Sequence, residues 1–183
     1  MAIVTTASAG MVTAGRATIL QVRAPLSSAR ATEREATALV ATSRVPVVVS
    51  SRCDIALAAG AAGVNLPEND IPVATARALM GERLVGRSVH SLESALRAEG
   101  EGADYVIFGP VWASASHPDS APAGVAALAQ VSHALRIPVL AIGGVTEERI
   151  AECHAAGAAG YAAIRMFEST PRNRRFRGGP GLK

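Results

Sequence analysis

Three short apolar runs of the sequence end in polar residues, glycine or proline, and these residues are the first candidates for chemistry. They are Ser88 and His90 after the first run, Pro110 after the second, and Gly143 with Gly144 after the third. A short apolar run that stops at such residues is typical of a buried strand. Because small molecules bind at the carboxyl ends of parallel strands, these positions predict one ligand site.

The pair Gly143 and Gly144 precedes a helix-like segment that begins near Thr146. Uncovered backbone N–H groups beside a helix N-terminus form an anion site. Arg165, expected at the end of the last strand next to Ile164, has a guanidinium that matches phosphate oxygens. A tight turn is the alternative for the glycines, and a surface cation is the alternative for the arginine. The sequence predicts a phosphate site made of Gly143, Gly144, Ile164 and Arg165.

Two arginines stand at the ends of neighbouring predicted strands. Arg23 follows Gln21 after the second strand, and Arg52 follows the third. Their guanidinium groups could converge on a carboxylate or on a second phosphate. Ion pairing with an acidic residue of the rim, such as Asp54 or Asp70, is the alternative for each. The predicted substrate-binding residues are Gln21, Arg23, Arg52, Ser88 and Pro110.

His117 and His90 are the histidines that could transfer a proton near neutral pH. His90 follows the fifth predicted strand, and His117 lies in a proline- and serine-rich loop, 113–123, that could fold over a ligand. An exposed loop position is the alternative for both. The predicted strand ends carry no paired carboxylates, Cys–His pair or metal triad, so we predict no metal site. Asp70 alone is a poor magnesium ligand unless phosphate oxygens complete the site.

Short β-branched runs alternate with alanine-rich helical stretches along the chain, as in βα units around a parallel sheet. Eight strands at intervals of roughly 20 residues favour a (β/α)8 TIM barrel over an open sheet. Because 183 residues is short for such a barrel, we expect an abbreviated first unit, with a short helix within 8–16. The predicted strands are 3–5, 18–22, 45–49, 63–66, 84–88, 105–108, 139–142 and 160–164. The predicted helices are 31–42, 54–60, 73–80, 91–99, 125–135 and 147–156, with Ser91 and Thr146 as N-caps.

Length and composition indicate one domain, 1–171, followed by a flexible basic tail, 172–183. The net charge of +3 becomes −2 when the five cations of that tail are left out, and only 3% of residues are aromatic, so we expect no nucleic-acid partner. The apolar runs are far shorter than the roughly 20 residues of a membrane span, and the first residues lack the basic start of a signal peptide. We therefore expect a cytoplasmic protein without a membrane partner.

The segments Gly86–Glu93, Ala103–Gly109 and Ala141–Gly144 together resemble the thiamine phosphate synthase and TenI family of small (β/α)8 barrels. The resemblance extends from Ile3 to about Ile164. It implies either of two activities: the synthase branch joins a pyrimidine diphosphate to a thiazole phosphate with magnesium, and the TenI branch tautomerises a thiazole carboxylate phosphate without a metal. In both cases the partner is a small phosphorylated heterocycle, and the chain could form a homo-oligomer.

Several positions depart from the synthase pattern that the resemblance implies. Pro25 stands where the synthase has the lysine of Gln-x-Arg-x-Lys, and Ser50–Arg52 replaces Asn-Asp-Arg, which removes one of two magnesium-binding aspartates. Asp70 matches the second aspartate. His117 stands in place of a lysine that contacts the diphosphate, and Arg165 replaces a phosphate-binding serine.

The segment Gly86–Glu93 and the pair Leu66–Pro67 look more like the TenI branch, although Pro110 stands where TenI has its proton-transferring histidine. We therefore expect a TenI-like protein, without a cofactor, that binds a phosphorylated thiazole carboxylate and could tautomerise it through His117 or His90. One alternative is a thiamine phosphate synthase, and magnesium is expected only in that case. The other is a non-catalytic protein that binds or senses a phosphorylated ligand.

Overall fold

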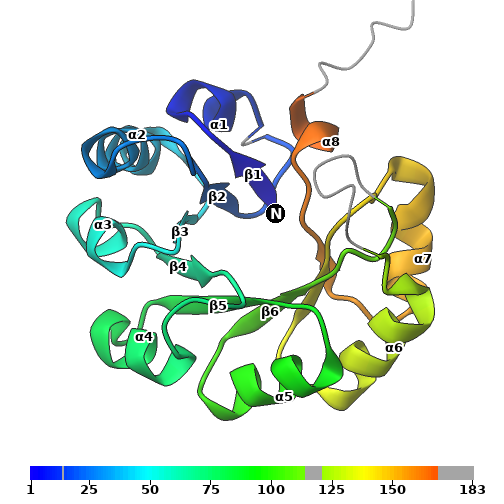
Figure 1. Cartoon of the computed structure of the whole chain (residues 1–183). Coiled ribbons are helices and arrows are strands. Elements are labelled where there is room, and N and C mark those ends of the chain that lie inside the picture. The colour runs from blue at the N-terminus through cyan, green and yellow to red at the C-terminus, as the bar shows by residue number, and fades with distance from the viewer. Residues whose placement is uncertain (14, 114–120, 169–183) are drawn as a thin grey trace, which may run out of the picture.

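The computed structural model describes residues 1–13, 15–113 and 121–168, and these fold into a ring of parallel strands surrounded by helices (Figure 1). Eight strands pair in the order of the sequence. They are β1 (Ala2–Val4), β2 (Leu20–Val22), β3 (Val47–Ser50), β4 (Gly63–Leu66), β5 (Leu84–Val89), β6 (Tyr105–Phe108), β7 (Val139–Ala141) and β8 (Gly160–Tyr161). The prediction of a (β/α)8 TIM barrel is confirmed.

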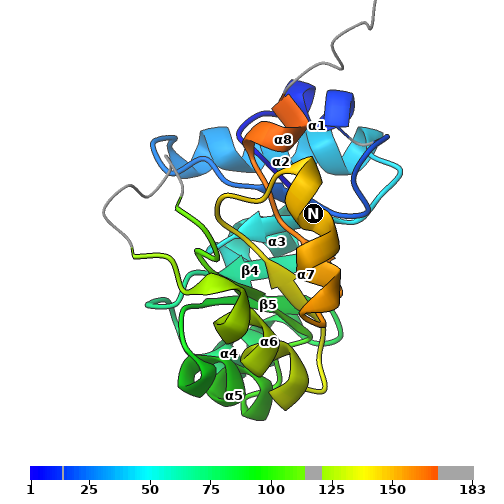
Figure 2. The same ribbon diagram turned by 90° about the vertical axis from the view of Figure 1, so that its right-hand side faces the viewer.

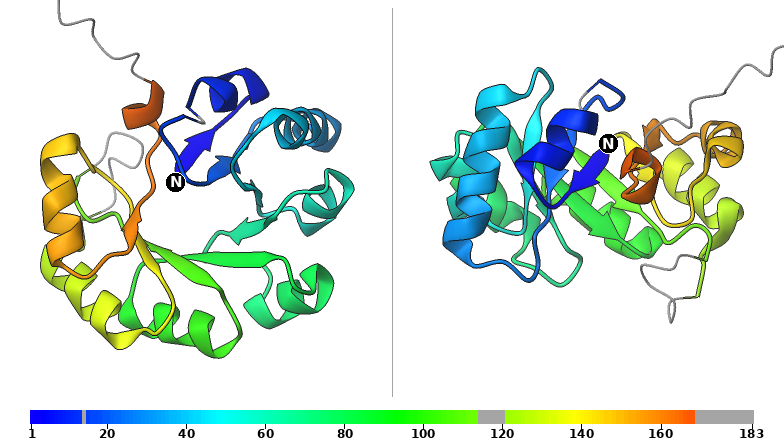
Figure 3. Two further views of the ribbon diagram at one scale, coloured as in Figure 1. Left: turned by 180° about the vertical axis from the view of Figure 1, so that it is seen from behind. Right: turned by 90° about the horizontal axis from the view of Figure 1, so that it is seen from above.

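Helices lie on the outside of the strands from the side (Figure 2) and from behind and above (Figure 3). They are α1 (Ala7–Thr13), α2 (Ala29–Thr42), α3 (Cys53–Ala58), α4 (Val73–Met80), α5 (Leu92–Gly100), α6 (Gly124–Ala134), the 3-10 helix η1 (Glu147–Arg149), α7 (Ile150–Ala155) and α8 (Arg165–Glu168). The seven residues of α1 confirm the abbreviated first unit. Among the helices of the described residues, none has the length and apolar character that a membrane crossing requires.

Side chains along each strand alternate between two apolar clusters, because successive residues of a strand point to opposite faces. One cluster lies between the strands and the helices and includes Val22, Val64 and Phe108. The other fills the inside of the ring and consists of Met1, Ile3, Val48, Tyr105, Ile107 and Ala162. Burial on both faces explains why the strands are apolar runs in the sequence.

The ring closes between β8 and β1 through a few backbone contacts. The N–H of Ile3 donates to the carbonyl oxygen of Ala163 (3.0 Å), and the N–H of Ala163 donates to that of Met1 (3.2 Å). The amino group of Met1 donates to the carbonyl oxygen of Tyr161 (2.7 Å), and burial lowers the pKa of this amino group to about 6. The N-terminal end of β1 is thus part of the closure.

Several predicted boundaries differ from the observed ones. β8 ends at Tyr161, not at residue 164, because only its first residues pair with β7, and Arg165 begins α8 instead of ending a strand. The predicted helix 147–156 consists of η1 and α7. Ser91 caps α5 as predicted, accepting a hydrogen bond from the N–H of Ser94 (3.0 Å). Thr146 makes no cap with its side chain. The predicted tail, 172–183, lies outside the described residues.

Candidate functional site

Polar side chains interrupt the apolar interior of the ring near the carboxyl ends of β2, β4 and β5. Gln21 and Asn65 are each 2% exposed, and their strand neighbours belong to the cluster under the helices, so both side chains face the inside of the ring. Nδ2 of Asn65 donates a hydrogen bond to Oγ of Ser88 across 3.1 Å. Within the residues that the structure describes, Gln21 Oε1 and Asn65 Oδ1 accept no hydrogen bond.

Buried carbonyl oxygens without a donor are uncommon, because nothing offsets the cost of removing them from water. Two such oxygens on inward-facing side chains suit a ligand that carries N–H or O–H groups. Gln21 was predicted as a site residue, and Asn65 was not. The signal for Asn65 is a polar residue at an inward position of the otherwise apolar run Gly63–Leu66.

The loop between β4 and α4, residues 67–72, presents a carboxylate to the neighbouring loop. Oδ2 of Asp70 accepts a hydrogen bond from the hydroxyl of Ser51, and Oδ1 accepts one from the N–H of Ile71 (2.7 Å). Among the described residues, Ser51 is the one non-glycine residue with a positive φ, +68°. Such conformations cost energy and are found most often at functional sites.

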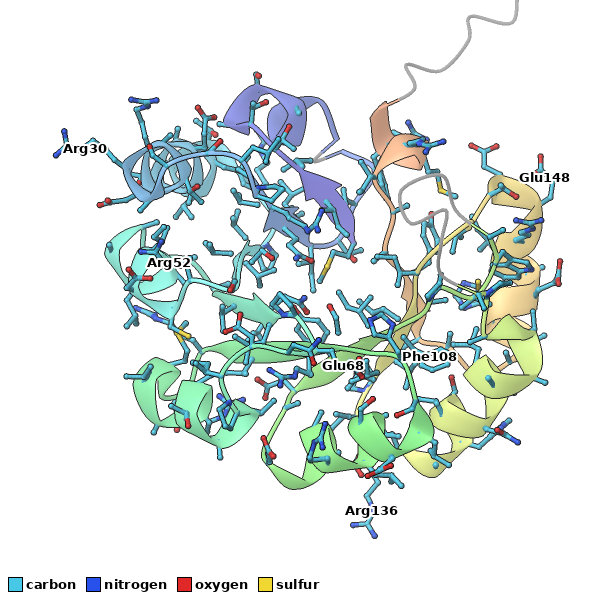
Figure 4. The ribbon with its side chains drawn as sticks, viewed as in Figure 1. Arg30, Arg52, Glu68, Phe108, Arg136 and Glu148 are labelled. Carbon is cyan, nitrogen blue, oxygen red and sulfur yellow. The ribbon has the colours of Figure 1, made fainter. Side chains whose placement is uncertain are left out.

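The same loop is connected to the loops that follow β5 and β6. Oε1 of Glu68 accepts a hydrogen bond from the N–H of His90 (3.1 Å), and its Oε2 lies 3.8 Å from Nε2 of His90. Nδ1 of His90 contacts the carbonyl oxygen of Gly109. Figure 4 labels Glu68 near the middle of the ring, in front of β5 and β6. Side chains therefore join four successive strand-end loops, those after β3, β4, β5 and β6.

The turn after β7 is made of Gly143 and Gly144, with φ of +89° and +66°. A Cβ atom at Gly143 would lie 2.6 Å from Pro110, and one at Gly144 would lie 2.7 Å from Trp112, so glycine is required by close packing as well as by conformation. The N–H groups of both residues donate to no group of the described residues. The turn is thus the tight one that the sequence allowed, and its two N–H groups have no acceptor among the described residues.

Arg149 supports this turn and was missed in the sequence. Its guanidinium donates to the carbonyl oxygen of Gly144 (2.7 Å) and lies over the ring of Trp112, 5.0 Å from the ring centre. An arginine within two turns after a glycine pair is the only sequence signal for it.

The two arginines predicted to converge have different surroundings. Arg23 is exposed and makes no ion pair within the described part of the chain. Arg52 pairs with Asp54 at the start of α3, with 2.8 Å between Nε and Oδ1, and this hydrogen bond lowers the pKa of the Asp54 carboxyl. Figure 4 shows Arg52 beside α3, toward the outside of the ring. The observed pair is the alternative that the sequence left open for Arg52.

The remaining predicted site residues do not lie together in one place. Arg165 is exposed at the first residue of α8, and Ile164 packs against the interior cluster. Pro110 follows β6 and contacts the glycine turn through its close approach to Gly143. His117 lies outside the residues that the structure describes.

Asp70, which the family resemblance matches to a magnesium-binding aspartate, lies in the loop between β4 and α4. In residues 1–13, 15–113 and 121–168, no three His, Cys, Asp or Glu side chains lie together as a metal site would require. Magnesium is often bound through one carboxylate when substrate phosphates supply further oxygens. The Asp70–Ser51 pair fits that arrangement, a magnesium ion shared with a phosphorylated substrate, and does not fit a resident ion held by protein alone.

Comparison with known proteins identifies relatives of this chain. Residues 4–167 match a protein family described as thiamine monophosphate synthase. The thiamine-phosphate synthase of Chloroflexus aurantiacus is 41% identical over 82% of this chain and 71% of its own length, and that of Anaeromyxobacter dehalogenans is 46% identical over 82% and 69%. The solved structure of thiamine phosphate pyrophosphorylase from Pyrococcus furiosus superposes with a TM-score of 0.81 at 31% identity, covering 89% of this chain and 83% of that one.

These findings correct the expectation of a TenI-like tautomerase, which is wrong. That expectation depended on Gly86–Glu93 and Leu66–Pro67, which form β5, the cap of α5 and the end of β4, where packing and capping determine much of the sequence. Three curated relatives that share 41% to 46% identity with the chain are named thiamine-phosphate synthases. The chain therefore belongs to the thiamine monophosphate synthase family.

Proposed function

We propose that this chain is a thiamine phosphate synthase, an enzyme that joins a pyrimidine diphosphate to a thiazole phosphate and releases diphosphate. The observation that carries the proposal is the high identity to synthases over most of the chain. The geometry supports it, because three different kinds of binding group lie near the carboxyl ends of the strands. These are buried acceptors, a carboxylate and unused backbone donors.

The buried acceptors suit a heterocycle that carries an amino group. Gln21 Oε1 and Asn65 Oδ1 would accept hydrogen bonds from the pyrimidine, while Ser88 fixes the amide of Asn65. The apolar side chains around them, such as Ile107, would pack against the pyrimidine.

The glycine turn after β7 suits the phosphate of the thiazole. Its two N–H groups would donate to phosphate oxygens, and Arg149 holds the turn by its contact with the Gly144 carbonyl oxygen. Ile164 and Arg165, which follow β8, would complete this phosphate site from the next loop.

The diphosphate would lie near the loops after β2, β3 and β4. Arg23 would contact it with an exposed guanidinium, and Asp70 would hold magnesium together with diphosphate oxygens. Magnesium would supply charge neutralisation for the departing diphosphate. Ser51 orients the Asp70 carboxylate through its hydroxyl.

The direct test is to incubate the purified protein with the pyrimidine diphosphate and the thiazole phosphate at increasing magnesium concentrations, and to measure thiamine phosphate by chromatography. We expect product that depends on magnesium. Absence of product at every magnesium concentration would overturn the proposal, and thiazole phosphate binding without turnover would favour a non-catalytic ligand-binding protein.

Replacing Asp70 by asparagine tests the carboxylate. D70N should raise the magnesium concentration needed for half-maximal activity by about tenfold or more, because the one carboxylate assigned to the ion loses its charge. D104N, a change at the opposite end of the ring, is the matched control and should leave that concentration unchanged.

A further inference from the structure

Arg87 is a buried cation at an unusual place in β5. It pairs in register with Leu66 of β4 and is 8% exposed. Burial lowers the pKa of its guanidinium from the ordinary value. A charged side chain in this position requires partners, because a buried guanidinium without hydrogen bonds strongly destabilises the folded state.

Among the described residues, the hydrogen-bond partners of Arg87 all belong to the loop between β4 and α4. Nη1 donates to the carbonyl oxygen of Ile71 (2.8 Å), and Nη2 donates to those of Glu68 (2.8 Å) and Asp70 (3.4 Å). One guanidinium thus satisfies three carbonyl oxygens of a short loop that has no sheet or helix partners for them. The planar fork of arginine suits this arrangement, and a lysine ammonium does not reproduce it.

The residues held by their backbone are those whose side chains enter the site. Asp70 contacts the Ser51 hydroxyl through its carboxylate, and Glu68 contacts His90. A loop displacement would therefore move both carboxylates at once and break contacts to two neighbouring loops.

We infer that Arg87 is a positioning residue, which holds the β4–α4 loop so that Asp70 faces the diphosphate and Glu68 keeps its contact with His90. The role of Asp70 in this inference rests on the proposed synthase function. Arg87 itself touches no reacting group, because its contacts are to backbone carbonyl oxygens.

Arg77 of α4 provides a matched control. Its guanidinium also donates to three backbone carbonyl oxygens, those of Gly81 (2.8 Å), Arg83 (2.7 Å) and Gly102 (3.0 Å), but at the N-terminal end of the strands. R77A therefore removes an arginine with similar contacts far from the proposed site.

The experiment compares R87A, R87K and R77A with the unchanged chain. We expect both Arg87 variants to raise the KM for the pyrimidine diphosphate and the magnesium requirement by roughly 10- to 100-fold, the usual range for residues that orient a metal ligand. The KM for thiazole phosphate should change less than about twofold, since Arg87 does not contact the glycine turn. Millimolar guanidinium should partly reverse the rise in the KM for the pyrimidine diphosphate in R87A. R77A should lower the melting temperature and leave the KM values unchanged.

A second measurement keeps the inference independent of activity. Hydrogen exchange of the amides in 67–72 should become faster in both Arg87 variants and stay unchanged in R77A. If the unchanged chain makes no thiamine phosphate, the proposed function fails, while the exchange data still decide whether Arg87 holds the loop. Unchanged hydrogen exchange in R87K would overturn the inference. An equal rise in the KM values for the pyrimidine diphosphate and the thiazole phosphate in R87A, not reversed by guanidinium, would also overturn it. If R87A does not fold, R87K carries the test.

Discussion

Two arginines of successive elements, Arg77 of α4 and Arg87 of β5, hold loops at opposite ends of the barrel, and each donates to three backbone carbonyl oxygens. The difference lies in the side chains of the held loops. At the N-terminal end, the carboxylate of Asp104 turns back to Arg77 itself and to the N–H of Val85. At the carboxyl end, Asp70 and Glu68 reach other loops. In our proposal, the same kind of contact stabilises the fold at one end and orients the candidate binding site at the other, the end where this architecture usually carries its site.

The interior shows the same contrast. Asn65 near the carboxyl end and Tyr105 near the N-terminal end are both buried, and each has an oxygen without a hydrogen-bond partner among the described residues. Burial raises the pKa of the Tyr105 hydroxyl. We interpret the Asn65 oxygen as a ligand contact and the Tyr105 hydroxyl as a cost to stability alone.

Placing a negative charge at each end tests the contrast most strongly. G144D should weaken binding of thiazole phosphate by at least about 100-fold, because a carboxylate would stand beside the phosphate and its Cβ would meet Trp112. Calorimetric titration measures the effect.

G60D is the control, since Gly60 has the same φ of +66°. Gly60 lies just after α3, at the N-terminal end of the strands, and a Cβ atom there would meet nothing within 4 Å. It should lower stability without changing thiazole phosphate affinity. Equal affinities of the unchanged chain and G144D for thiazole phosphate would show that the glycine turn does not bind the phosphate.

Removing the interior oxygens of Asn65 and Tyr105 is expected to have smaller effects, on substrate binding at one end of the barrel and on stability at the other. N65A should raise the KM for the pyrimidine diphosphate about tenfold through the loss of one ligand hydrogen bond. Y105F should leave that KM unchanged and increase the free energy of unfolding by about 1 kcal/mol, because a buried hydroxyl without a partner is removed. Denaturant unfolding and steady-state kinetics measure the two effects. A loss of stability in Y105F would contradict our interpretation of the N-terminal end.

The Met1 amino group is expected to make the free energy of unfolding depend on pH. Its pKa is about 6 in the folded protein and near 8 when exposed, so the unfolded chain binds more protons between these values. The free energy of unfolding should therefore rise by about 2 kcal/mol from pH 6 to pH 8. Acetylation of this group removes its titration, and an acetylated protein with the same pH slope would show that other groups cause it.

The sequence predicted the strands, most helices and the glycine turn, because these depend on local periodicity and on residues that end strands. It missed Arg87 and Arg149, although an arginine inside the apolar run Leu84–Val89 is itself a signal that a partner must exist. Their partners are backbone carbonyl oxygens of other segments, which residue types do not reveal. Arg52 was predicted in the substrate site and is found paired with Asp54, two residues away.

The branch of the family was predicted wrongly for a related reason. The departures at Pro25 and Ser51 suggested the loss of synthase chemistry, yet Ser51 keeps a hydrogen bond to Asp70. A single substituted ligand does not reveal how the neighbouring carboxylate is held, and similarity over the whole chain is the stronger guide.

The short closure between β8 and β1 also bears on how the barrel opens. β8 has two residues, whereas β4 and β5 pair at four positions, so we expect local unfolding to require less free energy at this closure than between β4 and β5. The proposed phosphate site joins the loops that follow β7 and β8. A ligand that binds the closed ring and not the opened one stabilises the closed form by linkage. The thiazole phosphate would therefore be a substrate and, while bound, part of what keeps the last strands of the ring in place.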